Sequence, residues 1–494
     1  MFAKLKITFK HTLIYSLGNI SSKIAGLILL PLYTNTNIFS TEDFGLLVLL
    51  EITSQIFVAV FALELGRSVL RWCAEEINIE IQKSIIFTSL IFIILIVISY
   101  NIVLSYHVKY FSILLFSNAD YANYFNLIFI WSGIVIINQI PMSILRVREK
   151  PIIYILFSVT NFVAVLLFII YFVVFQQKGV EGILLGQISG NLILSILTIP
   201  VIYKNSKMKL EFKIIWDMLK YGFPLIFSTL ASLLLSFGDR YILEYFLPIS
   251  IVGIYSLGYR IASTVNIFII QSFQLGYFPI AFKMIHEPNS KRFYSKVLTY
   301  YVIAISFISL LIALFSRELL VLISSKEYLI VYNIIPIILL SFIFRGIADM
   351  VSLGFFISKK TKYNSIIIIS GMLISVTTNF LLIPLFGMCG SAISMLIAFF
   401  LMTVSTYLIV NKIFPINYEI RKIILIIFGG IVLFIPTIFI TELNFFTQLI
   451  IKIVIIILFP FGLFYVNIFE EIEIAKIKEI FNLLKKPFNK KYIE

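Results

Sequence analysis

Several charged side chains lie deep inside apolar segments of this chain. Lys23 lies about 18 Å from one end of the apolar segment at 11–33, and Arg260 about 15 Å from one end of the segment at 248–275, at the rise of an α-helix. A charge at the centre of a bilayer costs about 2.5–3.5 kcal/mol on insertion scales, so such residues are candidates for a functional site. Two cations at similar depth could hold an anionic group such as a phosphate by charge-assisted hydrogen bonds.

Polar residues continue the helix faces that carry these two cations. Asn19 precedes Lys23 by four residues, and Ser263 and Gln271 follow Arg260 at helical spacing. Such faces meet water or protein and not lipid. The pattern therefore predicts a cationic, substrate-binding cavity lined by these five residues.

No carboxylate lies three or four residues from Arg260 on its own helix. We therefore expect this arginine to be unpaired. On that expectation Arg260→Ala would stop transport and leave the protein folded, because removing an unpaired buried charge relieves a cost. Arg260→Lys would keep part of the activity, since the point charge survives and only the forked geometry is lost.

Acidic residues in the apolar segments have more than one interpretation. Glu51 lies about 13 Å into the segment at 42–66, where it could neutralise Lys23 or hold a coupling ion. Asp239 could hold a coupling ion or pair with its neighbour Arg240. H⁺ and Na⁺ are both possible coupling ions.

Other charges in apolar segments have simpler interpretations. Arg345 and Asp349 are four residues apart, so they can form a structural ion pair on one helix face. Glu64, Arg240 and Lys452 lie close enough to the end of a segment for their side chains to reach the membrane surface.

Signals for catalysis, metals and nucleotides are missing from the sequence. There is no Gly-x-x-x-x-Gly-Lys phosphate loop, so ATP is not expected to power the protein directly. His11, His107 and His286 lie in different segments without a ligand cluster. We predict no catalytic residue, no metal site and no bound cofactor, and we do not expect an enzyme.

The segments that position these residues are transmembrane helices. Of the 494 residues, 60% are hydrophobic and 13% charged, against about 25% charged in an ordinary soluble domain. Apolar runs of helical length recur from end to end, each long enough to cross a bilayer. We predict about fourteen spans, at 11–33, 42–66, 84–106, 122–145, 151–175, 180–203, 217–243, 248–275, 294–316, 329–357, 363–385, 388–411, 421–441 and 446–468.

The distribution of basic residues predicts the orientation. With the N-terminus inside, 30 of the 39 Lys and Arg residues fall in cytoplasmic segments, four in outer loops and five within spans. This asymmetry follows the positive-inside rule and explains the net charge of +14 without nucleic acid. We predict a multi-pass protein of the cytoplasmic membrane with both termini in the cytoplasm.

A repeat with an offset of about 208 residues runs through the chain. Gly45 corresponds to Gly253, and the Gly-x-x-Gly at 179–182 to the one at 387–390. Ser117 and Tyr121 match residues 207 positions further on. Chance is the alternative, since glycine is common in turns. A duplicated six-helix unit predicts two lobes in parallel orientation around a central cavity.

The repeat divides the chain into five predicted parts. The N-lobe covers 1–203, a cytoplasmic linker 204–216, the C-lobe 217–411, two further helices 412–468 and a basic cytoplasmic tail 469–494. The fold class is therefore an all-α integral membrane protein with two six-helix lobes and two C-terminal helices.

Several stretches resemble the oligosaccharide flippases of polysaccharide biosynthesis, in the multidrug/oligosaccharidyl-lipid/polysaccharide exporter superfamily. The most specific are LKYGFP at 219–224, DRYIL at 239–243 and VGIYSLGYRI at 252–261. NFLLIPLFGMCGSAI at 379–393 is similar to the family's signature between helices 11 and 12. The junction of helices 1 and 2, PLY followed by DFGL, is also similar.

The resemblance implies a flippase of the O-antigen type. It would move undecaprenyl-diphosphate-linked oligosaccharide repeat units to the outer leaflet by alternating access, for surface polysaccharide biosynthesis. It also implies basic residues on helices 1 and 8, where Lys23 and Arg260 lie. Expected partners are the lipid-linked substrate, membrane lipids, and the polysaccharide polymerase and glycosyltransferases of the pathway, but no nucleic acid.

Two alternatives remain at this point. One is an exporter of small molecules or of a lipid-linked peptidoglycan precursor. The more distant one is a membrane-embedded polysaccharide polymerase or sugar transferase, which would need larger outer loops than this chain has.

The charge asymmetry generates a topological prediction. Reporter fusions near residues 210 and 490 should read cytoplasmic, and fusions near residues 247 and 443 external. The measurement is paired alkaline phosphatase and fluorescent-protein activity in whole cells. An external reading at residue 490 would contradict the fourteen-span topology.

Overall fold

The computed structural model describes residues 28–116, 118–439, 443–466, 468 and 470. Within these residues the chain is helical and has no strand. Helices are the expected solution in a bilayer, since every backbone N–H and C=O must find its partner within the protein. The all-α fold class is therefore confirmed.

Thirteen helices among the described residues are long and apolar enough to cross a membrane. They agree with thirteen of the predicted spans to within a few residues at most ends, and the predicted first span at 11–33 lies largely outside the described residues. The spans of the first half include α3 (Thr41–Phe61), α5 (Ile79–Ser105), α7 (Ala122–Val147), α8 (Pro151–Ile170) with the π-helical turn η1 (Tyr171–Phe175), and α9 (Gly179–Asn205). Those of the second half include α10 (Phe212–Phe237), α12 (Ile249–Val265) continued by η2 (Asn266–Gln271), α13 (Ser272–Lys283) and η3 (Met284–His286), and then α14 (Ser290–Leu314), α16 (Ile335–Val351), α18 (Lys362–Phe386), α19 (Met388–Ile413), α20 (Ile420–Phe434) and α22 (Phe445–Tyr465).

Shorter helices extend or connect these spans. They are α2 (Leu30–Tyr33), α4 (Leu65–Glu75), α6 (Val108–Phe116), α11 (Asp239–Phe246), α15 (Ser316–Ile323), η4 (Lys326–Asn333), α17 (Leu353–Ile357) and α21 (Pro436–Phe439). Counted in chain order, the second predicted span is divided into α3 and α4, and the seventh into α10 and α11. We call α3 and α4 together helix 2.

Local sequence signals explain where several helices begin. Ser40 and Asp43 form a capping box at the start of α3, in which each side chain accepts a hydrogen bond from the other residue's backbone N–H, at 3.0 Å in both cases. Gly179 and Gly387, at equivalent places in the repeat, have φ of +53° and +58° at the starts of α9 and α19. Glycine adopts this left-handed conformation without steric cost, so the repeated motif marks a repeated turn.

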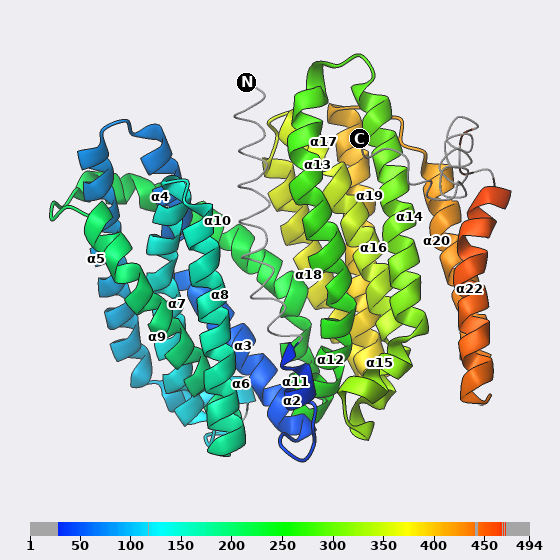
Figure 1. The fold of residues 1–494 in the computed structure, drawn as a ribbon, viewed down its shortest axis with the longest axis horizontal. Coiled ribbons are helices and arrows are strands. Elements are labelled where there is room, and N and C mark those ends of the chain that lie inside the picture. The colour runs from blue at the N-terminus through cyan, green and yellow to red at the C-terminus, as the bar shows by residue number, and fades with distance from the viewer. Residues whose placement is uncertain (1–27, 117, 440–442, 467, 469, 471–494) are drawn as a thin grey trace, which may run out of the picture. The chain divides into compact units, whose positions relative to one another are not determined.

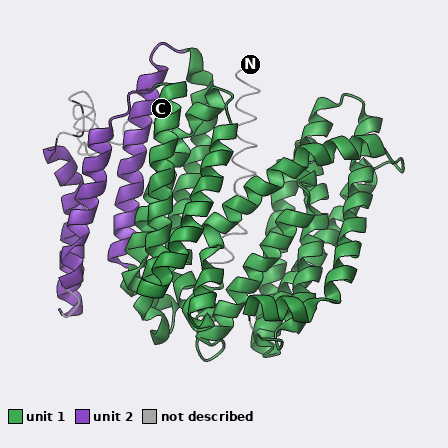
Figure 2. Cartoon of the chain, turned by 180° about the vertical axis from the view of Figure 1, so that it is seen from behind, with its two compact units in different colours: residues 1–286, 316–415 green, residues 287–315, 416–494 purple. Residues whose placement is uncertain are grey.

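The chain separates into two compact units (Figure 2). The first contains residues 1–286 and 316–415, and the second residues 287–315 and 416–494. The first unit joins the predicted N-lobe, linker and C-lobe, whereas α14, placed in the C-lobe by its position in the sequence, groups with α20 and α22.

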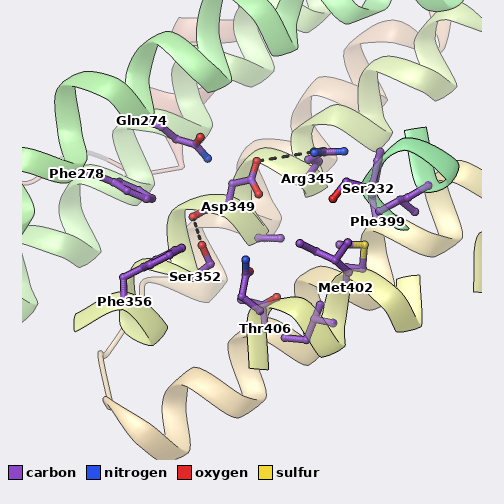
Figure 3. A pocket seen from close by; sticks show the side chains of 15 residues that line it. Ser232, Gln274, Phe278, Arg345, Asp349, Ser352, Phe356, Phe399, Met402 and Thr406 are labelled. Carbon is purple, nitrogen blue, oxygen red and sulfur yellow. Dashed lines mark hydrogen bonds and ion pairs between the residues drawn. The ribbon is translucent and has the colours of Figure 1, made fainter. Parts of the chain in front are cut away.

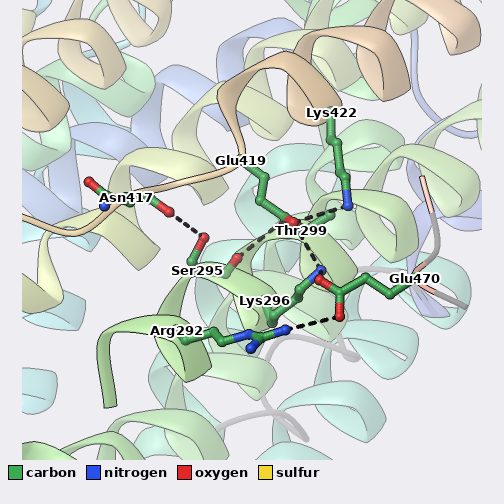
Figure 4. Close-up of polar contacts among 8 residues, drawn as sticks. All are labelled: Arg292, Ser295, Lys296, Thr299, Asn417, Glu419, Lys422 and Glu470. Atoms are coloured by element: carbon green, nitrogen blue, oxygen red, sulfur yellow. Dashed lines mark hydrogen bonds and ion pairs between the residues drawn. The ribbon is translucent and has the colours of Figure 1, made fainter. Parts of the chain in front are cut away.

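Ionic and polar contacts give the physical reason for this grouping (Figure 4). Glu419, directly before α20, accepts from Lys296 Nζ at 2.9 Å and from Thr299 Oγ1 at 2.8 Å, both on α14. Burial raises the pKa of Glu419, but hydrogen bonds from Lys296, Thr299 and Lys422 lower it below its usual value. Glu470 also accepts from Lys296, at 2.7 Å.

The first unit contains the N-lobe and, apart from α14, the C-lobe, and helices pack side by side within each lobe (Figure 1). In the N-lobe, α9 packs against both α7 and α8, and α5 packs against α7. In the C-lobe, α19 packs against α16 and α18, and α12 packs against α16.

Helices α3 and α12 join the two repeats through a close crossing at the equivalent glycines. A Cβ on Gly45 would lie 2.1 Å from the carbonyl oxygen of Ile249, and a Cβ on Gly253 would lie 2.3 Å from that of Thr41. Small residues permit backbones to approach this closely in membrane proteins. The crossing brings together residues that are about 208 positions apart.

This crossing predicts a specific loss of stability. Gly45→Ala should lower stability by about 1–3 kcal/mol, because the new methyl group meets backbone that cannot move aside. The measurement is thermal unfolding of the purified protein in detergent. Gly276→Ala on α13 is the matched control, since a Cβ there meets nothing within 4 Å and gains up to about 1 kcal/mol of helix propensity. Equal melting temperatures for the two variants would contradict the close crossing.

Candidate functional site

Arg260 of α12 forms an ion pair with Glu51 of α3. Its Nη2 lies 2.6 Å from Oε2 of the carboxylate, and its guanidinium lies over the rings of Phe44 and Tyr33, 5.2 and 5.8 Å from the ring centroids. The expectation that Arg260 is unpaired is therefore wrong. The partner comes from another helix and is brought there by the Gly45 and Gly253 crossing, which spacing along one helix does not reveal.

The pairing changes what an alanine at position 260 should do. The two side chains are only 20% and 22% exposed. Removing one of them would leave a partly buried charge without its partner, which destabilises a protein instead of relieving it. Glu51 neutralises Arg260 in this structure, while Lys23 and Asn19 lie outside the described residues.

The other residues predicted to line the cationic cavity have separate positions. The Ser263 hydroxyl donates to the carbonyl oxygen of Arg260 at 2.9 Å, so it binds its own helix. Gln271 ends the π-helical turn η2. Among the described residues, the charged partner of Arg260 is Glu51 of α3.

Asp239 and Arg240 form a buried pair at the start of α11. The carboxylate accepts from Tyr255 at 2.7 Å and from Ser391 at 2.9 Å, and it also accepts from Nη1 of Arg240. Arg240 is 1% exposed and its guanidinium lies 4.0 Å from the centroid of the Tyr259 ring. The expectation that Arg240 reaches a membrane surface is therefore wrong. The carboxylate of Asp239 is already paired with a cation, the guanidinium of Arg240.

The first unit contains a cavity of about 590 Å³, which we call the N-lobe cavity. Its polar and charged lining comes from α3, α7, α8, α9, α10 and the segment around α4. The lining includes Ser54, Gln55, Glu64, Arg67, Asn138, Gln139, Arg146, Tyr154, Asn191 and Thr229, with Trp131 on one wall. A pocket of this size, with a few convergent polar groups, suits a ligand of several hundred daltons.

Glu64 lies where helix 2 is interrupted. Leu63 and Glu64 have φ of +47° and +53°, in the left-handed region, between the end of α3 and the start of α4. The Glu64 carboxylate accepts from Thr229 of α10 at 2.6 Å and pairs with Arg67 Nε at 3.2 Å. Its side chain is 12% exposed, so this residue lines the cavity and does not reach a membrane surface as we had expected.

Arg67 and Arg146 give the N-lobe cavity two guanidinium groups. Arg67 is 62% exposed although it pairs with Glu64. Arg146 donates through Nη2 to the hydroxyl of buried Tyr154 at 2.5 Å, and its Cζ lies 4.8 Å from the centroid of that ring. Tyr154 thus orients Arg146. Forked donors of this kind match the oxygen atoms of a phosphate.

Arg67 and Arg146 contributed to the sequence prediction only through the distribution of basic residues, which predicted the topology. Both fall in segments that the positive-inside rule places in the cytoplasm, and no binding role was predicted for them. The division of helix 2 moves Glu64 and Arg67 to the cavity wall.

A second cavity, of about 160 Å³, lies in the C-lobe and is called the C-lobe cavity (Figure 3). Its lining comes from α10, α13, α16, α17, α18 and α19. It contains the predicted ion pair, with Arg345 Nε 3.8 Å from Asp349 Oδ2. Ser232, Gln274, Asn364 and Thr406 add polar groups.

Metal binding has no support among the described residues, which contain no group of three or more His, Cys, Asp and Glu able to hold an ion. The chemistry of the two cavities is that of hydrogen bonding and charge. Such cavities can bind and orient a polar, anionic ligand.

Comparisons with known proteins agree with a membrane protein of this fold. Residues 8–285 match the family described as polysaccharide biosynthesis protein. An uncharacterized membrane protein of Methanocaldococcus jannaschii is 29% identical over 284 residues, which are 54% of this chain. The chain spans 55% of the length of that relative.

Solved structures show the same fold. The lipid II flippase MurJ in an inward closed conformation has a TM-score of 0.72 at 16% identity, covering 92% of this chain and 99% of that one. An inward-facing multidrug resistance MATE family transporter has a TM-score of 0.65 at 14% identity, covering 81% and 94%. A variant of the Vibrio cholerae MATE transporter VcmN has a TM-score of 0.60 at 16% identity, covering 82% and 96%.

The ion pair between α3 and α12 generates the next prediction. Glu51→Gln and Arg260→Gln should each destabilise the protein, and the double variant should recover part of the loss, with a coupling energy of about 0.5–3 kcal/mol. The measurement is a double-mutant cycle by thermal unfolding in detergent. The matched control is Arg71 with Glu75, an exposed pair 2.9 Å apart, for which the coupling should not exceed about 0.5 kcal/mol. Additive effects at positions 51 and 260 would show that the pair contributes nothing.

Proposed function

The chain belongs to the polysaccharide biosynthesis protein family, and from this premise we propose that it flips a diphosphate-linked lipid across the cytoplasmic membrane. The substrate is an undecaprenyl-diphosphate-linked oligosaccharide repeat unit, moved from the inner to the outer leaflet. Both termini face the cytoplasm, and the protein acts by alternating access between its two lobes.

The observation that carries the proposal is the N-lobe cavity with Arg67 and Arg146. Two guanidinium groups and one carboxylate, Glu64, leave the charged lining with a net positive charge. A diphosphate is the part of the substrate that needs such a site, while amide and hydroxyl side chains suit the hydroxyl groups of sugars. The polyprenyl chain needs no polar site and can stay in the lipid.

The membrane potential gives the transport a direction. It is negative inside and contributes about 2.3 kcal/mol per charge per 100 mV, so it favours outward movement of an anionic headgroup. The cavity lining is cationic, which also disfavours the export of small cations. That alternative would need acidic residues to dominate the cavity.

A lipid-linked peptidoglycan precursor is the second candidate. It shares the diphosphate and the polyprenyl chain, and the lipid II flippase MurJ has a similar fold. The family match favours the oligosaccharide. The headgroup beyond the diphosphate distinguishes the two, so both lipids belong in the experiment.

The prediction concerns the two arginines. In proteoliposomes containing the purified protein, Arg67→Ala and Arg146→Ala should each slow flipping of an undecaprenyl-diphosphate-linked oligosaccharide by about 10- to 100-fold, because each removes a charged hydrogen bond of about 1.5–3 kcal/mol. The lysine variants should keep part of the rate, since they retain the charge. Flipping is measured as accessibility of the sugar to an external periodate or lectin reagent.

Arg71→Ala is the matched control. Arg71 lies on the same short helix as Arg67, but it pairs with Glu75 and does not line the cavity. Wild-type vesicles that flip lipid II and not the oligosaccharide would assign the second function. Vesicles that flip neither lipid would contradict the proposal.

A further inference from the structure

An apolar groove, which we call the α10 groove, lies beside the break in helix 2. Its volume is about 440 Å³. One lining residue belongs to the break and the others belong to α10, and apart from one lysine amine their side chains are apolar or aromatic. They are Leu63, Trp216, Leu219, Lys220, Phe223 and Pro224. The function proposed above does not use this groove.

The groove is part of an exposed apolar face of α10. Phe212, Trp216, Phe223 and Phe227 recur at helical spacing and are between 56% and 71% exposed. Lys220 lies among them, near the predicted cytoplasmic end of the span, with Nζ 5.8 Å from the centroid of the Trp216 ring. A lysine stem can lie along apolar surface while its amine reaches the membrane surface. The face is therefore open to a hydrocarbon chain at the depth of the inner leaflet.

The α10 groove and the N-lobe cavity share two walls. Leu63 lines the groove, while its neighbour Glu64 lines the cavity. On α10, Pro224 lines the groove, while Thr229, which donates to Glu64 at 2.6 Å, lines the cavity. The two walls touch where a Cβ on Gly222 would lie 2.4 Å from the carbonyl oxygen of Leu63, and beyond the break α4 and α10 pack side by side (Figure 1). An apolar groove and a cationic cavity thus occupy neighbouring residues of the same two elements.

This arrangement matches the two ends of a diphosphate-linked lipid. The diphosphate requires donors such as Arg67 and Arg146 of the cavity, and the chain requires an apolar surface. A free chain gains no hydrophobic free energy by moving from lipid to an apolar protein surface, so the groove does not select it on that basis. A chain tethered to a bound diphosphate differs, because its contact with the groove is intramolecular and its effective concentration there is high.

We propose that the α10 groove holds the first isoprene units of the lipid whose diphosphate lies in the N-lobe cavity. This inference rests on the function proposed above and adds the place of the chain. The lipid enters from the inner leaflet beside the break in helix 2, with its headgroup on the side of Glu64 and its chain on the side of Leu63. Bilayer phospholipids lack the tether, so they occupy the groove only in proportion to their abundance.

Photo-cross-linking tests the place of the chain. A benzophenone amino acid replaces Phe223 in the full-length protein, in nanodiscs that contain undecaprenyl-diphosphate-linked oligosaccharide as a minor lipid. Mass spectrometry should identify the polyprenyl lipid as the main adduct. The matched control has the same amino acid at Phe461 of α22, which is 65% exposed, and should yield mainly phospholipid adducts. Adducts at both positions in proportion to the lipid composition would overturn the proposal.

The tether has its own test in the protein labelled at position 223. At a lipid concentration below saturation, Arg146→Ala should lower the yield of the polyprenyl adduct about 10- to 100-fold, because it removes a charged hydrogen bond to the diphosphate. Arg67→Ala makes the same test if Arg146→Ala does not fold, as judged by its melting temperature. Arg71→Ala should leave the yield unchanged, since Arg71 pairs with Glu75 and does not line the cavity. An undiminished adduct in folded Arg146→Ala and Arg67→Ala would overturn the tether.

Filling the groove separates the place of the chain from that of the headgroup. Leu219→Trp puts a larger side chain into the groove, so it should lose most of the flipping of the undecaprenyl-diphosphate-linked oligosaccharide. Its affinity for an oligosaccharide diphosphate without the chain should equal that of the wild type. Phe461→Trp is the matched control and should change neither. Wild-type flipping in Leu219→Trp, with an unchanged polyprenyl adduct at position 223, would overturn the proposal.

The same measurements distinguish this inference from the proposed function. A polyprenyl adduct at position 223 in a protein that flips no lipid would support the groove and contradict the function. Normal flipping of the oligosaccharide lipid without a polyprenyl adduct at position 223 would support the function and overturn the groove.

Discussion

The free-energy cost of placing a charged side chain in hydrocarbon constrains how the helices of this protein pack. A charged side chain at membrane depth must meet an opposite charge, a dipole or water, and several of the described ones meet an opposite charge. The pairs are Glu51 with Arg260, Glu64 with Arg67, Asp239 with Arg240, and Arg345 with Asp349. They differ in exposure: Asp239 and Arg240 are enclosed, whereas Asp349 is 36% and Arg67 62% exposed. Exposure therefore separates the buried pair, which fixes helices, from pairs that water can reach.

Duplication gives the molecule two related cavities with different chemistry. The close crossing at Gly45 and Gly253 depends on glycine in both repeats, so this part of the scaffold stays symmetric. The cavities are under no such constraint: the charged lining of the N-lobe cavity is Glu64, Arg67 and Arg146, and that of the C-lobe cavity is Arg345 and Asp349. The cavities of the two lobes can therefore differ in chemistry while the framework is retained.

The sequence predicted the helices better than the site. Apolar length and the distribution of Lys and Arg locate spans directly, because the bilayer constrains each helix by itself. The partner of Arg260 could not be found in this way, since Glu51 lies on a different helix and meets it only after folding. Arg67 and Arg146 were used only to predict topology, because the sequence does not show that the chain turns at Leu63 and Glu64, both with left-handed backbone, before α4 begins. The predicted roles of Lys23 and Asn19 stay predictions.

The left-handed backbone at Leu63 and Glu64 divides helix 2 into two linked segments, α3 and α4. Left-handed residues other than glycine cost about 1–2 kcal/mol each, so the contacts of Glu64 with Thr229 and Arg67 must hold this conformation in place. On one side of the articulation α3 crosses α12, and on the other α4 contacts α10, where the Ser68 hydroxyl donates to the carbonyl oxygen of Met218 at 3.2 Å. In an unbroken helix, a tilt at one end would also tilt the other end. With two links, α3 and α4 each take the direction set by their own contact with the second repeat.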